Sequence, residues 1–158
     1  MTIYFLQIEP VYVISSEEVF WGALLVAITM AIHTFGMLLV LRINEYLKSR
    51  LDKKTGFMPG LIPIMLASCL ILLIHMMEVV IWAIFFYWKG AFPNVSIAYY
   101  FALNEYTTVG SKFNLPIPLR LLEGIISCAG LLAFALSTGI LFRLATTFLE
   151  KPRKFLGK

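Results

Sequence analysis

The chain has 158 residues, of which 60% are hydrophobic and only 14% are charged, whereas soluble domains average about half apolar and a quarter charged. Together with a mean hydropathy of +0.87, this composition predicts a single-domain integral membrane protein. It excludes a secreted soluble domain, a disordered tail, a large multidomain enzyme and a nucleic-acid binder that works through a basic patch. The formal charge of +4 gains meaning only from where the charges lie.

Three apolar stretches, residues 19–41, 61–88 and 121–142, are long enough to cross a bilayer. At about 1.5 Å per residue, each covers a hydrocarbon core of roughly 30 Å. The amino-terminal residues lack the basic segment of a signal peptide, and no small-residue cleavage pattern follows the first stretch, so we expect that span to be retained. The sequence therefore predicts an all-α membrane protein with three transmembrane helices.

The charges predict an orientation. Residues 1–18 contain three glutamates and no Lys or Arg, whereas residues 42–60 and 143–158 hold ten of the thirteen basic residues. Three spans put these two basic segments on one side, so the positive-inside rule predicts an external amino terminus and a cytoplasmic carboxyl terminus. We divide the chain into an outer segment, first span and cytoplasmic loop (1–60), a central module (61–145) and a basic tail (146–158). The tail is topogenic, with binding of anionic lipid head groups as a further possible role.

The outer region between the second and third spans contains an unusual segment. Residues 94–106 are mainly apolar and aromatic, and the Pro93-Asn94 pair at their start is typical of a helix start. The segment is too short to span and too apolar for water. We therefore expect a re-entrant half-helix, buried in protein or facing a water-filled cavity. Aromatic residues close the second span, and we expect them to anchor it at the interface; they are Trp82, Phe85, Tyr87 and Trp88.

The half-helix is followed by Thr107-Thr108-Val109-Gly110. In this setting the sequence resembles the pore module of tetrameric potassium channels and of small bacterial two-transmembrane channels, in which an outer helix, a pore helix, a T-T-V-G-Y-G-D filter and an inner helix follow one another. The resemblance covers roughly residues 61–145. It implies a homotetramer in the lipid bilayer that passes K⁺ or another monovalent cation.

The resemblance also implies functional residues. Ions would bind at 107–110 and Ser111, and Phe134 and Thr138 would line an inner cavity. Backbone carbonyls from four copies replace the water shell of a potassium ion, and glycine permits the left-handed backbone that aims them at one axis. We expect no cofactor, no resident metal and no nucleic-acid partner. No nucleophile–base pair or phosphate-binding loop supports an enzyme.

The filter-like segment departs from the family pattern, because Ser111-Lys112-Phe113 replaces Tyr-Gly-Asp. Four Lys112 ammoniums at about 10 Å from an axis would repel a cation by roughly 6–7 kcal/mol in total at an effective dielectric constant near 20. An outward-directed lysine would remove most of that repulsion. Two functions stay open: a cation pore subunit with a TTVGSK filter, and a non-conducting scaffold or accessory subunit among unrelated membrane subunits. Glu105 either supports the filter from behind or faces a neighbouring subunit.

Ionisable residues inside the spans need partners, because each costs about 2.5–3.5 kcal/mol to insert. His75 and Glu78 share one helix face, and His33 lies at the same depth in the antiparallel first span. We favour a buried hydrogen-bonded cluster over a proton-linked site or a metal site, and a metal-dependent membrane enzyme is the remote third class. For Gly130, a helix bend and close helix packing are equally compatible with the sequence.

Overall fold

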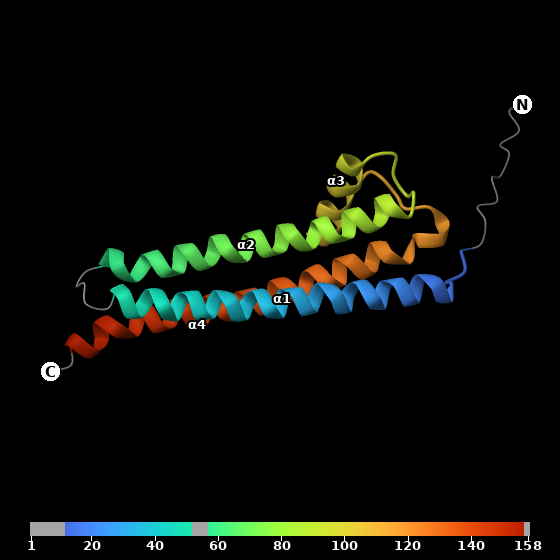
Figure 1. The fold of residues 1–158 in the computed structure, drawn as a ribbon. Coiled ribbons are helices and arrows are strands. Elements are labelled where there is room, and N and C mark those ends of the chain that lie inside the picture. The colour runs from blue at the N-terminus through green and yellow to red at the C-terminus, as the bar shows by residue number, and fades with distance from the viewer. Residues whose placement is uncertain (1–11, 52–56, 157–158) are drawn as a thin grey trace, which may run out of the picture.

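The computed structural model describes residues 12–51 and 57–156, and this part of the chain is helical without strands. The helices are α1 (Ser16–Leu51), α2 (Phe57–Trp88), α3 (Val95–Tyr106) and α4 (Leu121–Leu156), with a 3₁₀ turn at Ile117–Leu119. In Figure 1 the three long helices run side by side, and α3 stands where α2 ends and α4 begins. Five charged residues that the orientation prediction uses lie outside the described residues; they are Glu9, Asp52, Lys53, Lys54 and Lys158.

Within residues 12–51 and 57–156, three helices are long and apolar enough to cross a membrane, over Ser16–Arg50, Leu61–Trp88 and Ile117–Thr147. The chain therefore fits a multi-pass membrane protein, as the sequence predicts. The helices α1 and α4 continue beyond the apolar stretches into the basic segments. The apolar pattern ends at the first charged residue. The helix continues past that residue, because leucine, lysine, arginine and glutamate are all good helix formers.

Side-chain caps begin two of the helices. The Asn94 side chain accepts a hydrogen bond from the backbone N–H of Ile97 at 2.9 Å, which starts α3 where the Pro-Asn pair predicts. At the start of α1, Glu18 N–H donates to Ser15 Oγ at 3.1 Å, and the Glu18 carboxylate accepts from Ser15 N–H at 3.0 Å. This reciprocal pair is a capping box, and it fixes the first turn of α1.

The main core lies between the four helices near the α3 end of the bundle. Its largest fully buried apolar residues include Trp82, Phe86, Phe101, Leu122 and Ile126. Trp82 and Phe85 correct one expectation, because both side chains are buried in the core and are not interfacial anchors. The Nε1–H of Trp82 donates to Thr29 Oγ1 at 3.1 Å. Tyr87 and Trp88 do stay exposed at this end of α2.

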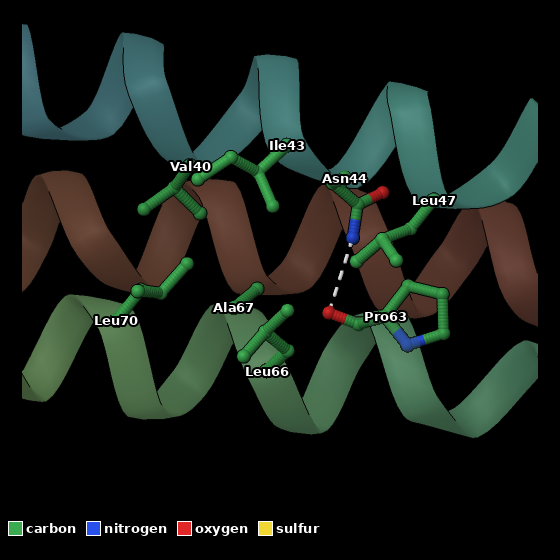
Figure 2. Close-up of a pocket in the computed structure, with 8 residues that line it drawn as sticks. All are labelled: Val40, Ile43, Asn44, Leu47, Pro63, Leu66, Ala67 and Leu70. Carbon is green, nitrogen blue, oxygen red and sulfur yellow. Dashed lines mark hydrogen bonds between the residues drawn. The ribbon is translucent and has the colours of Figure 1, made fainter.

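The opposite end of the bundle has a small apolar pocket between α1 and α2. Asn44 lies at its edge, and its Nδ2 donates to the backbone carbonyl of Pro63 at 3.2 Å (Figure 2). The Asn44 Oδ1 atom is buried and has no partner among the described residues. At this pocket, the bond from Asn44 to Pro63 joins the two helices. The rest of the lining is aliphatic and includes Val40, Ile43, Leu47, Leu66, Ala67 and Leu70.

Candidate functional site

The short helix α3 packs one face against α2 and α4. Its buried residues are Ala98, Phe101, Ala102 and Tyr106. The Phe101 ring lies 5.4 Å from that of Phe86 and 4.9 Å from that of Phe92, measured between centroids. Apolar contacts thus hold the first half of the helix, and polar contacts hold its carboxyl end.

The carboxyl end of α3 lies against the backbone of α4 at Gly130. A Cβ atom at this position would collide with the backbone carbonyl of Tyr106. One turn earlier on α4, Ser127 Oγ donates to the Glu105 carbonyl at 2.9 Å. Of the two roles considered for Gly130, close packing is the one that this contact requires.

The segment that follows α3 folds back onto it. The N–H groups of Val109 and Gly110 both donate to the Asn104 carbonyl, at 3.0 and 3.2 Å, and Thr108 N–H donates to the Glu105 carbonyl at 3.0 Å. The φ angle is +61° at Thr108 and +81° at Gly110. Positive φ is ordinary for glycine but rare for a β-branched residue, so the chain holds Thr108 in an unfavourable conformation.

Two carboxylates accept hydrogen bonds from the loop that follows this segment in the chain. Glu105 accepts a hydrogen bond from the Ser111 N–H at 2.8 Å. A contact of this type corresponds to one of the two roles expected for Glu105, support of the filter-like segment. Glu123 accepts from the Leu115 N–H at 2.5 Å. Burial raises the pKa of Glu105; the bond from Ser111 opposes this rise, and the negative charge of Glu123 adds to it. The loop therefore depends on backbone bonds to acidic side chains at both of its ends.

Lys112 is exposed, and its position is defined by an aromatic neighbour. The ammonium lies 5.3 Å from the centroid of the Phe113 ring, within the range of a cation–π contact. Phe113 in turn packs edge-to-face against Phe92 and Tyr100, at 6.5 and 6.1 Å between centroids. The lysine is thus associated with the aromatic residues around α3.

The structure brings together the three ionisable residues predicted to meet within the spans. His33 Nδ1 lies 2.9 Å from Glu78 Oε1, and His75 Nδ1 lies 3.6 Å from Glu78 Oε2. Two further side chains join them: Tyr106 at the end of α3 and Ser137 on α4. All five are buried, and they come from four different helices.

Hydrogen bonds connect the five side chains into a closed ring, which we call the polar ring. Tyr106 donates to Glu78 and lies 3.0 Å from His75 Nδ1. Ser137 Oγ lies 3.0 Å from His75 Nε2 and 3.4 Å from His33 Nε2. Burial, together with the neighbouring Glu78 carboxylate, raises the pKa of Tyr106, so the phenol keeps its proton.

Sequence reasoning missed Tyr106 and Ser137 as members of the polar ring. A signal existed for Tyr106, because a tyrosine on the buried face of an apolar helix needs a partner for its hydroxyl. Ser137 carried no such signal, because serines on membrane helices commonly bond their own backbone. Phe134 stacks on the His75 ring at 4.5 Å between centroids, and exposed Thr138 donates to the Phe134 carbonyl.

The possible ligand atoms of His33, His75 and Glu78 lie within 4.8 Å of one another. Each of these residues also has hydrogen-bond partners within the polar ring, so in this structure the three form part of a hydrogen-bonded cluster. No protein-family model, curated protein or solved structure matches the chain. Its resemblance to potassium channels therefore depends on the residues at 107–110 and on their setting between two spans.

Proposed function

We propose that the chain is a potassium-channel-like cation pore subunit. Four copies surround an axis, α3 is a re-entrant pore helix, and the backbone from Thr107 to Ser111 lines the ion path. The observation that carries this proposal is the seating of α3, whose carboxyl end contacts Glu78 on α2 and Gly130 on α4.

The depth of α3 follows from its two contacts. Tyr106 bonds Glu78, which lies ten residues before the end of α2 at Trp88, or about 15 Å along the helix axis. Tyr106 also touches Gly130, nine residues after the start of α4, or about 14 Å along that axis. The helix α3 starts near the end of α2 and the beginning of α4, and its carboxyl end lies at this level. This course supports the proposal that α3 is a re-entrant helix.

The hydrogen bonds of the following segment support the same function. Its N–H groups bond back to carbonyls of α3, and no donor among the described residues bonds the carbonyls of 107–111. Carbonyls without protein donors are the groups that replace the hydration shell of a cation. The negative end of the α3 dipole points to the same place and favours a cation there.

Lys112 favours a second candidate, a non-conducting scaffold within a larger membrane assembly. An exposed ammonium two residues after Gly110 repels cations unless its side chain is directed away from the path. The Lys112 ammonium lies against the Phe113 ring, and the pore proposal requires that this contact hold it away from the ion path.

The test is rubidium uptake by liposomes that contain purified protein and a potassium gradient. We expect uptake with the native chain, equal or greater uptake with Lys112→Gly, and native-like uptake with the charge-preserving Lys112→Arg. Gly110→Ala is the matched negative control: a Cβ there has free space but meets a strained backbone at φ +81°, so uptake should fall. If all four proteins give no uptake and cross-linking yields single copies, the pore proposal is wrong and the scaffold remains.

A further inference from the structure

The polar ring has five hydrogen bonds, and each bond needs one hydrogen atom. With Glu78 ionised and both imidazoles neutral, the ring owns four: one each on Tyr106 and Ser137, and one on each histidine. Four hydrogens cannot fill five bonds. In this state, one pair of ring atoms must consist of two acceptors facing each other.

The directions of the bonds locate that pair. Tyr106 donates to the Glu78 carboxylate, so His75 Nδ1–H donates to the Tyr106 oxygen, and His75 Nε2 accepts from Ser137. On the other side, His33 Nδ1–H donates to Glu78 Oε1. The two remaining acceptors are Ser137 Oγ and His33 Nε2, and their separation of 3.4 Å is the longest of the hydrogen-bond distances in the ring.

The net charge of the polar ring also indicates that the missing hydrogen belongs on His33 Nε2. With four hydrogens the ring carries one negative charge, fully buried near the middle of the spans. Among the described residues, no Lys or Arg bonds any member. An uncompensated charge at this depth is expensive. A proton on His33 Nε2 would neutralise the ring and would supply the missing hydrogen without reversing any other bond.

We propose that the polar ring is a proton-binding site that holds a fifth, exchangeable proton on His33 as an imidazolium. Glu78 and His75 face this imidazolium from α2, the Ser137 hydroxyl from α4, and Tyr106 borders the same cluster from α3. The site is independent of ion conduction, because it needs only the four packed helices.

Nitrogen NMR of the protein in lipid bilayers tests this site. The chain has two histidines, so isotope-labelled histidine in a sample without a polyhistidine tag reports on His33 and His75 alone. Near neutral pH we expect one imidazolium, with two protonated ring nitrogens, and one neutral ring protonated at Nδ1. His75→Asn identifies the imidazolium as His33. Two neutral rings, or two imidazoliums, would overturn the proposal.

Variants separate a proton site from a merely structural cluster. In Glu78→Gln the compensating negative charge is gone, so His33 should lose the imidazolium signal at the same pH. In Ser137→Ala the carboxylate remains, so we expect the imidazolium signal to persist near neutral pH. An imidazolium that persists in Glu78→Gln, or that is lost in Ser137→Ala, contradicts the proposal. So does elemental analysis that finds one tightly bound metal ion per chain. If Glu78→Gln does not fold, the nitrogen NMR spectrum and the metal content of the native protein still test the proposal.

Discussion

Glu18 is 1% exposed, although it is one of three acidic residues in the amino-terminal region. Besides closing the capping box with Ser15, its carboxylate accepts hydrogen bonds from the Tyr12 hydroxyl and from the Leu121 N–H, both at 3.0 Å. Leu121 is the first residue of α4. One carboxylate therefore stabilises the starts of two helices, and at each it lies at the positive end of a helix dipole.

This arrangement predicts different roles for two adjacent glutamates. Glu18→Ala removes a cap and a buried acceptor, so the free energy of unfolding should fall by about 2–4 kcal/mol. Glu17→Ala is the control, since the Glu17 side chain is 66% exposed and its partner is Lys89; because solvent screens this pair, the loss there should be much smaller than for Glu18→Ala. Denaturant unfolding in mixed micelles, followed by circular dichroism, measures both. Equal losses would refute the role of Glu18.

At the level of elements, α3 depends on one close backbone contact with α4. Gly130 permits that contact, whereas a Cβ atom added at Gly124 or Gly139 on the same helix would meet no described atom within 4 Å. The same residue type thus serves a packing role at one position of α4 and has no such role at two others. Sequence alone does not distinguish these glycines, because the partner of Gly130 comes from another helix.

Alanine substitutions provide a matched comparison. Gly130→Ala forces α3 away from α4, and we expect it to destabilise the fold by about 1–3 kcal/mol. Gly139→Ala meets open space and should be neutral or stabilise the helix by up to about 1 kcal/mol. The same micelle unfolding assay applies. If Gly130→Ala matches Gly139→Ala in stability, the close approach of Tyr106 to α4 is wrong.

For the whole molecule, much of the fold was predictable because it depends on local patterns. Apolar length predicted the three spans, and the Pro-Asn pair predicted the start of α3 at Asn94. The convergence of His33 with Glu78 followed from their equal depth in antiparallel helices. A hydrogen-bond partner for the Tyr106 hydroxyl was predictable, but the membership of Tyr106 and Ser137 in the polar ring was not, since it requires the rotation of each helix about its axis. The burial of Trp82 depends on the same rotation and was missed for the same reason.

The membrane orientation remains a prediction of the charge pattern, and cysteine labelling can test it. In a background with both native cysteines, Cys69 and Cys128, replaced by alanine, single cysteines are placed at exposed Ser49 and Ser96. A membrane-impermeant maleimide should label Ser96→Cys in intact cells and Ser49→Cys only after permeabilisation. The reverse labelling pattern would show that the amino terminus is cytoplasmic.

The place of Tyr106 at the end of α3 has a consequence for biogenesis. The long helices can enter the bilayer separately, but until α3 docks, the Glu78 carboxylate lacks one of its hydrogen-bond donors in a medium without water. An incompletely assembled chain therefore displays a poorly compensated acid within the membrane. Docking of α3 removes that defect, because the Tyr106 hydroxyl then donates to the Glu78 carboxylate.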